Sequence, residues 1–344
     1  MDLHTAGHRR GVVAAPHHAA VEAGRAALAE GGNALEAMVA MAATIAVVYP
    51  HMTHLGGDGF WLVREPSGRV RALMAAGRAG ANARRELYRD YEAIPPRGPL
   101  AALTVPGAIA GWMLALEAAA ASGGRMRLRD LLAAAIAHAK EGAPVTRGQA
   151  RLTAEQLAEL KDVPGFAPTF LLEGKPPAAG AMLKQPALAA TLDHLAHAGL
   201  IDFYRGDVGR EIAADLERMG SPLTRTDLER CRATLAEPLS VSIDAGTLFN
   251  TPPPTQGLAS LIILALFERL RVAQAEGFDH IHGLVEATKR AIPIACRIRS
   301  SVIWTQNSSM PKPLRSTGAR PRRGCRPSAR AAPFGWARPT PRAS

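Results

Sequence analysis

The net positive charge of this chain lies entirely in its last 52 residues. Residues 293–344 contain ten Arg, one Lys and no Asp or Glu, whereas the 292 residues before them carry thirty basic and thirty acidic side chains. The sequence pI of about 10.3 therefore describes a terminal segment and not the whole surface. A break of this kind indicates two kinds of sequence in one chain, whose functions have to be considered separately.

The basic segment has the composition of a chain that does not fold. It contains eight Pro and seven Ser, and apolar periodicity is lost except in a short patch at residues 301–304. Such a segment buries too little apolar surface to offset the entropy of ordering it. We therefore expect one domain over residues 1–292, followed by a disordered Arg/Pro/Ser-rich tail over residues 293–344.

The composition of the first 292 residues favours an enzyme scaffold of the α/β or α+β class. They are rich in Ala, Gly and Leu and poor in aromatic residues. They contain no unbroken apolar run of eighteen residues and no apolar secretory signal, so neither a membrane helix nor export is expected. The three cysteines show no CxxC spacing, which predicts neither a disulfide framework nor a zinc site. A cytoplasmic location is the simplest assignment.

Helical patterns in this part of the chain alternate with two β-hairpins. Asn33, with Glu36 three residues later, predicts a capping box at the start of the second helix. The hairpins are predicted at residues 60–64 with 70–74, and at residues 239–243 with 247–250. Helices are expected at residues 18–30, 34–49, 105–121, 128–140, 185–198, 208–219, 224–231, 258–270 and 278–292.

An ordered set of motifs resembles the gamma-glutamyltransferase family of the N-terminal-nucleophile hydrolase superfamily. The set comprises GGNALEAMVA leading through YPHMTHLGGDGFWLV, TVPGAIAGWMLAL, HAKEGAPVT, IDFYRGDVGREIAADL, LTRTDLERCRATLAEPLSV, the connector PPPTQG and EATKRAI. The resemblance covers residues 10–292, which correspond to the large subunit of the family. HMTHLGGDGFWL and AGRAG (residues 76–80) are more similar to its amidohydrolase-like branch than to glutathione-specific members.

The resemblance implies a fold and a chemistry. The fold is the large-subunit portion of an αββα sandwich, here incomplete. In the family the precursor cleaves itself, and the new N-terminal Thr of the small subunit is the nucleophile, with its own α-amine as the base. Its substrates are γ-glutamyl compounds or small amides, and no cofactor is implied. The expected partners are therefore a small-molecule amide and a small subunit, with no membrane.

Beyond Ile292 the sequence stops resembling the family, and no Thr-led small-subunit start follows. We therefore expect no catalytic residue in this chain, an inactive chain by itself, and a truncation or a frameshift at this point. Whether the chain is an enzyme is left open. The alternative is a non-enzymatic binding protein whose basic tail contacts RNA or DNA. Non-specific attraction to polyanions is expected under either hypothesis.

Two features are candidate site residues. Family members that bind glutamate hold its carboxylate with an Arg after the first hairpin. Ala76 occupies that position here, and Arg78, two residues on, could substitute for it or be a solvated surface residue.

The other feature is the turn Gly56, Gly57, Asp58 and Gly59, which is expected to be structural because glycine allows unusual φ angles and close packing. The spacing of His51, His54 and Asp58 could also suit a metal ion. The resemblance explains the segment as a turn, so no metal site is expected.

Overall fold

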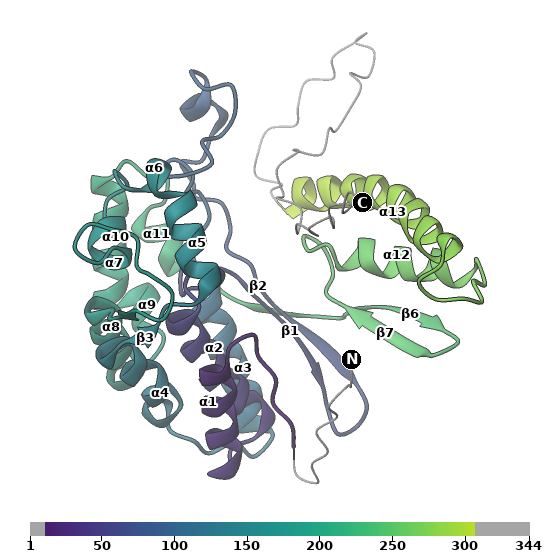
Figure 1. Cartoon of the computed structure of the whole chain (residues 1–344), viewed down its shortest axis with the longest axis horizontal. Coiled ribbons are helices and arrows are strands. Elements are labelled where there is room, and N and C mark those ends of the chain that lie inside the picture. Colours follow the sequence, from purple (N-terminus) through teal and green to yellow (C-terminus); the bar gives the residue numbers. More distant parts are fainter. Residues whose placement is uncertain (1–10, 307–344) are drawn as a thin grey trace, which may run out of the picture.

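The computed structural model describes residues 11–306, with side-chain burial for residues 11–298. Most of the helices lie to one side of a small antiparallel sheet in the middle of the molecule (Figure 1). The strands are β1 (Gly59–Arg64), β2 (Val70–Ala75), β3 (Ala143–Pro144), β4 (Met182–Leu183), β5 (Thr234–Ala236), β6 (Leu239–Ile243) and β7 (Gly246–Asn250). The helices are α1 (His18–Ala29), α2 (Ala34–Val48), α3 (Ala108–Ala121), α4 (Leu128–Glu141), α5 (Arg147–Glu155), α6 (Leu157–Leu160), α7 (Phe166–Phe170), α8 (Pro186–Ala198), α9 (Asp202–Arg205), α10 (Asp207–Arg218), α11 (Arg225–Glu229), α12 (Gly257–Glu268) and α13 (Phe278–Gln306), with a 3₁₀ turn at Arg85–Tyr88.

The start of α2 confirms the predicted capping box. The Asn33 side-chain oxygen accepts hydrogen bonds from the backbone N–H groups of Leu35 and Glu36, both at 3.1 Å, and the Glu36 carboxylate accepts from the Asn33 N–H at 2.7 Å. Glu36 is 2% exposed, and its second oxygen accepts from the Met126 N–H at 2.8 Å. The Asn33 amide also donates to the Ala119 carbonyl at 3.0 Å. This cap therefore ties α2 to the end of α3 and the start of α4.

Replacing Asn33 by Ala is expected to lower the free energy of unfolding by about 2 kcal/mol. The loss combines an N-cap worth about 1 kcal/mol with the loss of the hydrogen bond from the Asn33 amide to the Ala119 carbonyl, worth about another 1 kcal/mol. Urea denaturation followed by circular dichroism measures it. Asn82→Ala is the matched control because Asn82 is exposed; equal losses for both variants would contradict the role of the cap.

The central sheet has the strand order β1-β2-β5, and all its pairs are antiparallel. Phe60 lies opposite Met74 and Arg64 opposite Val70, which confirms the first predicted hairpin. Helix α3 packs on β1 and β2. Ala75 and the Trp61 indole lie close to the backbone of α3 at Gly111. The sheet and α3 thus form two layers, and α2, α4 and α8 pack successively outward from α3.

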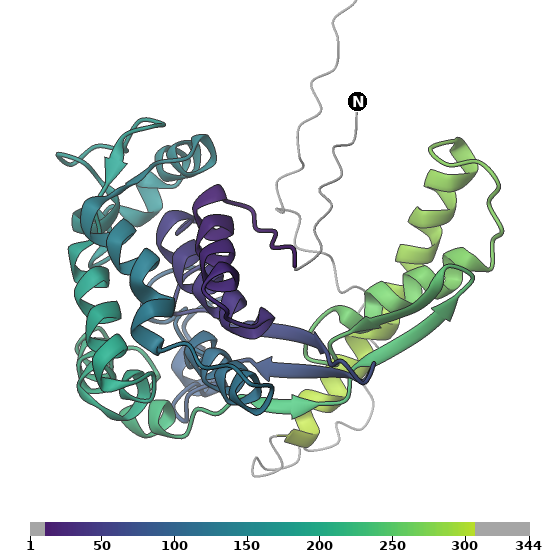
Figure 2. The same cartoon turned by 90° about the horizontal axis from the view of Figure 1, so that it is seen from below.

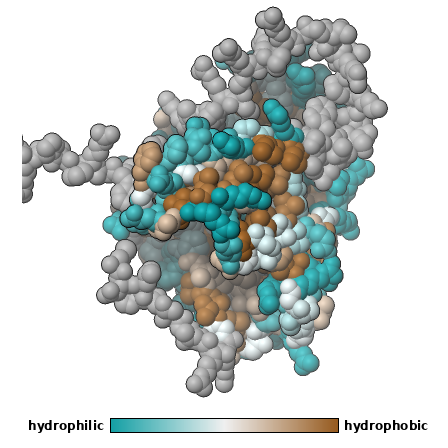
Figure 3. All heavy atoms as spheres, turned by 90° about the vertical axis from the view of Figure 1, so that its right-hand side faces the viewer, coloured by the Kyte–Doolittle hydropathy of each residue, from teal (hydrophilic) through white to brown (hydrophobic). Residues whose placement is uncertain are grey.

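A second group of elements lies to one side of the sheet, beyond β5 (Figures 1 and 2). It contains the second predicted hairpin, β6 and β7, in which Leu239 lies opposite Asn250 and Ile243 opposite Gly246. Helix α12 packs on this hairpin, and α13 packs on α12. Figure 3 views this side of the molecule and shows apolar side chains on its surface. In this group of elements, the side chains of Phe249, Leu264 and Ile281 are exposed.

The end of the last helix differs from the prediction. Helix α13 continues past Ile292 to Gln306, with Pro293 inside it. Pro293 removes one backbone hydrogen bond of the helix, and the apolar residues Ile294 and Ile298 follow it four residues apart. The prediction that the chain is disordered from residue 293 onward is therefore wrong for residues 293–306. Residues 307–344, and the disorder predicted for them, lie outside the described residues.

None of the described helices is both long enough and apolar enough to cross a membrane.

Candidate functional site

The glycine turn before β1 is held against the first turn of α3. The Gly57 carbonyl accepts hydrogen bonds from the backbone N–H groups of Gly107 and Ala108, both at 2.8 Å. The first N–H groups of a helix have no partner within the helix, and the N-cap residue of α3, Gly107, has no side chain that could accept from them. The turn therefore supplies the missing acceptor and fixes where β1 starts relative to α3.

Asp58 joins the end of β2 to the same point. Its carboxylate accepts a hydrogen bond from the Gly77 N–H at 2.8 Å. A Cβ atom at Gly77 would lie 1.5 Å from the Val105 carbonyl oxygen, and one at Gly107 would lie 2.2 Å from the Ala75 carbonyl oxygen. Three backbone segments therefore meet here without room for a side chain. We call this meeting point, formed by Gly57, Asp58, Gly77 and Gly107, the glycine junction.

Of the predicted turn residues Gly56, Gly57, Asp58 and Gly59, the middle two belong to the glycine junction. Gly56, Gly57 and Gly59 are absent from the glycines with positive φ in the described chain, and a Cβ at each would meet its nearest neighbour at 3.2 to 3.5 Å. Within the junction, the contacts at Gly77 and Gly107 are much tighter than the contact at Gly57. Gly77 and Gly107 both lie within family-like motifs, AGRAG and TVPGAIAGWMLAL, but local patterning does not predict their close contacts, because the atoms they approach belong to distant segments.

A buried tyrosine supports the start of α3 from the other side. The Tyr204 hydroxyl donates to the Pro106 carbonyl at 2.7 Å and accepts from the Ala110 N–H at 3.0 Å. The Cys231 thiol lies 3.7 Å from the same Pro106 oxygen. Burial raises the pKa of the Tyr204 hydroxyl far above its ordinary value, and the neighbouring Cys231 adds to this shift. Burial also raises the pKa of the Cys231 thiol. Both groups are therefore neutral at physiological pH.

Replacing Tyr204 by Phe is expected to lower the free energy of unfolding by about 1–2 kcal/mol, because the Ala110 N–H loses its acceptor. As pH rises above about 10, the unfolded wild-type chain releases the Tyr204 proton first. The free energy of unfolding of the wild type then falls, so its difference from that of the variant should become smaller. Denaturant titrations at pH 8 and pH 10.5 test both statements. Tyr91→Phe, at a 48% exposed position, is the control; a Tyr204→Phe loss no larger than that of Tyr91→Phe would rule out this role.

Arg78 lies next to the glycine junction and is exposed. Strand β2 ends at Ala75, so strand alternation cannot place Arg78 on the same face as Ala76. The backbone is instead fixed by the Val105 N–H, which donates to the Arg78 carbonyl at 2.9 Å. No hydrogen bond or ion pair to the Arg78 side chain occurs among the described residues. Its guanidinium is therefore available to a ligand, and its role in substrate binding stays a prediction.

Two of the three residues with metal-like spacing make other contacts. Asp58 is engaged by Gly77, and the His51 ring packs against Tyr49 with centroids 4.2 Å apart. In the part of the chain that the structure describes, no group of three His, Cys, Asp or Glu side chains could hold a metal ion.

Solved structures define the class of this fold. The gamma-glutamyltranspeptidase of Helicobacter pylori matches with a TM-score of 0.78 at 26% identity, over 84% of each chain. A cephalosporin acylase from Bacillus halodurans matches with a TM-score of 0.73 at 31% identity, over 79% of this chain and 52% of that chain. The fold is the large-subunit portion of an N-terminal-nucleophile hydrolase, as the resemblance implied.

The sequence model of gamma-glutamyltranspeptidase matches residues 20–305, and the chain belongs to this family. The match continues beyond Ile292, where the resemblance was expected to end. That expected limit is therefore corrected to residue 305, in agreement with the continuous helix α13.

Curated relatives differ widely in similarity. The oxamate amidohydrolase proenzyme of Klebsiella pneumoniae is 48% identical over 83% of this chain and 54% of the relative. A glutathione hydrolase-like proenzyme of Bacillus subtilis is 38% identical over 81% and 53%. The glutathione hydrolase proenzyme of Escherichia coli is 31% identical over 82% and 50%. The chain thus spans about half the length of these relatives.

Proposed function

We propose that this chain is the large-subunit part of an amide hydrolase for small amidated acids, with oxamate as the leading candidate. The observation that carries the proposal is the 48% identity to the oxamate amidohydrolase proenzyme, against 31% to the glutathione hydrolase of Escherichia coli. Ala76, in the position that the family resemblance assigns to a glutamate-binding Arg, argues against γ-glutamyl specificity.

The glycine junction supports this proposal through its geometry. Asp58 and Val105 fix the backbone on either side of Arg78 by hydrogen bonds of 2.8 and 2.9 Å. An exposed guanidinium on a rigid backbone is suited to a carboxylate, which it can bind through two parallel hydrogen bonds. Oxamate offers one carboxylate next to its amide. Arg78 would hold the carboxylate and so orient the amide carbon.

The reaction also needs a nucleophile, which the proposal assigns to the Thr that begins the small subunit. The Thr oxygen attacks the amide carbon, its α-amine takes the proton, and ammonia leaves. Water then releases the acid and restores the Thr. This chain contributes the acid-binding side of the site, and the nucleophile is not among the described residues.

A chimeric proenzyme tests the proposal. Residues 1–306 are joined in frame to the C-terminal half of the Klebsiella oxamate amidohydrolase proenzyme. We expect two bands on a denaturing gel after self-cleavage, and ammonia release from oxamate that exceeds glutamate release from glutathione. The same chimera with its small-subunit Thr replaced by Ala should do neither. A cleaved chimera that prefers glutathione, or hydrolyses neither compound, would refute the substrate class.

The break in composition carries a second, separate proposal. The helix and the family match both reach about residue 305, whereas the acid-free composition begins at residue 293. We propose a frameshift that falls nearer codon 305 than codon 292. Sequencing the coding region on both sides of codon 305 tests it. Polyanion binding by residues 307–344, which lie outside the described chain, stays a prediction.

A further inference from the structure

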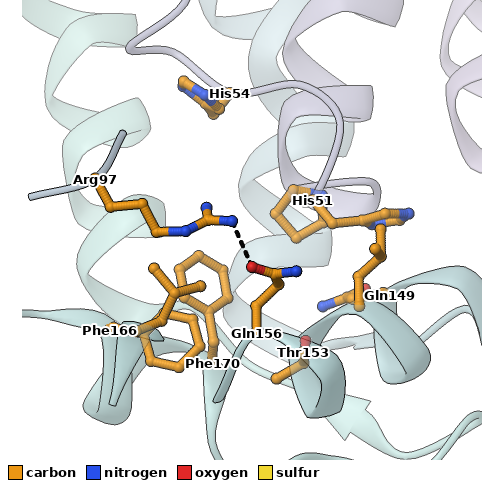
Figure 4. A pocket seen from close by; sticks show the side chains of 11 residues that line it. His51, His54, Arg97, Gln149, Thr153, Gln156, Phe166 and Phe170 are labelled. Atoms are coloured by element: carbon orange, nitrogen blue, oxygen red, sulfur yellow. Dashed lines mark hydrogen bonds between the residues drawn. The ribbon is translucent and has the colours of Figure 1, made fainter. Parts of the chain in front are cut away.

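A cavity of about 490 Å³ lies between the loop that follows α2 and the helices α5 to α7 (Figure 4). Its volume is within the range of small-molecule sites. His54, on its rim, also lines a separate hollow beside β1 that includes Asp58. The loop that carries the glycine turn thus forms one wall of this cavity, while Arg78 does not line it.

One side of the cavity is apolar. The rings of Phe166 and Phe170 have centroids 5.5 Å apart and are tilted by 41°. Leu152 and Leu160 lie beside them in the lining, and all four side chains are only half-buried. Such a wall suits a flat or branched apolar group of a ligand.

The other side presents polar groups that lack partners. Gln149 is 3% exposed and Thr153 is 8% exposed, and both line the cavity. Within the described residues, neither side chain makes a hydrogen bond through its amide or hydroxyl group; Gln149 participates only through its backbone N–H. His51 Nδ1 is also buried without a partner. A buried polar atom without a partner is rare in native proteins. The His51 Nδ1 atom is one such atom, and the side chains of Gln149 and Thr153 line the same cavity, so the three together indicate a polar ligand.

The permanent charge of the lining comes from Arg97 alone, since no Asp or Glu belongs to it. Arg97 donates through Nη2 to the Gln156 side-chain oxygen, as Figure 4 shows. Its Nε donates to Glu159 at 2.5 Å. Glu159 is 60% exposed and lies outside the lining. Burial lowers the pKa of His51, which keeps that ring uncharged near neutral pH. The cavity therefore favours an anion over a cation.

We propose that this cavity is a second ligand site, separate from the glycine junction, which binds a small carboxylate with an aromatic body. The ring of the ligand lies against Phe166 and Phe170. Its carboxylate lies at Arg97, where Gln149 and Thr153 can reach it or a neighbouring polar group.

The test measures binding of 3-phenylpropanoate to the full chain by isothermal titration calorimetry. We expect a Kd of roughly 0.1–1 mM, as is usual for a ligand of this size. The neutral 3-phenylpropan-1-ol, which keeps the ring and loses the charge, should bind at least about tenfold more weakly. Acetate, which keeps the charge and loses the ring, should give no measurable heat at the same concentrations. Equal affinities for the acid and the alcohol, or no binding of the acid at about 10 mM, would overturn the proposal.

Two variants locate the site. Arg97→Gln should weaken binding of the acid about tenfold and leave that of the alcohol unchanged, whereas Phe170→Ala should weaken both. Arg89→Gln is the matched control, because Arg89 is exposed and its one ion pair within residues 11–306 is with its neighbour Asp90. Thermal melting checks that each variant is folded. If Arg97→Gln and Arg89→Gln retain the same affinity for the acid, the carboxylate does not lie in this cavity and the proposal fails. The comparison of acid with alcohol in the unaltered protein stands even if a variant does not fold.

Discussion

Replacing Gly77 by Ala is expected to lower the free energy of unfolding by more than about 4 kcal/mol, a loss seen only where a substitution disrupts a packed structure. The added methyl group would lie 1.5 Å from the Val105 carbonyl oxygen and 2.5 Å from its carbonyl carbon. Both are backbone atoms, so no side-chain rotation relieves the contact. The segments must separate, and the hydrogen bonds from Gly77 to Asp58 and from Val105 to Arg78 would be lost with them.

The matched control is Gly277→Ala, because the nearest atom to a Cβ there is 4.0 Å away. Loss of glycine at an unhindered position changes stability by about 1 kcal/mol or less. Melting temperatures of the two variants and the wild type, measured side by side, decide the matter. If Gly77→Ala melts within about 2 °C of Gly277→Ala, the glycine junction is not closely packed in solution.

Helix starts and hairpins were predicted correctly where the interacting residues are close together in the sequence. Asn33 and Glu36 are three residues apart, so their capping box was evident in the sequence and is present in the structure. Both hairpins were also predicted, because apolar strands flank a short turn in each. The glycine junction has no such local cause. Gly77 is about thirty residues from Val105, and only the fold brings the two together.

Two misses have physical explanations. Helices α5 to α7, which form most of the cavity wall, were not predicted; they are short, and their residues lack a sustained apolar period. The last helix was predicted to end at Ile292 because Pro293 follows, yet it runs to Gln306. A proline inside a helix removes one backbone N–H donor and disturbs one turn. A helix can tolerate this disturbance when the residues on both sides of the proline favour the helical conformation. The charge composition changes abruptly at residue 293, whereas the backbone shows no break there and stays helical to Gln306.

Replacing Arg78 has the largest expected effect on activity. In the cleaved chimera, Arg78→Gln should lower kcat/KM for oxamate about 100-fold, mainly through a higher KM. The variant keeps side-chain length and polarity but removes the charge that would hold the carboxylate; a lost charge-assisted contact of this kind costs about 1.5–3 kcal/mol. Acetamide has no carboxylate, so its slower hydrolysis should change less than about threefold. Ammonia release from both amides, measured over a range of concentrations, provides these values.

Two further substitutions separate charge from geometry at this position. Arg78→Lys keeps the charge but not the planar pair of donors, and should fall between the wild type and Arg78→Gln. Arg85→Gln, at another exposed arginine of the same segment, should have no effect on either amide. A similar loss for oxamate and acetamide in Arg78→Gln would mean that Arg78 maintains the junction and does not bind the acid. If kcat/KM of Arg78→Gln for oxamate did not fall, Arg78 would be a solvated surface residue without a role in binding. The substrate carboxylate would then have to be held by the small subunit.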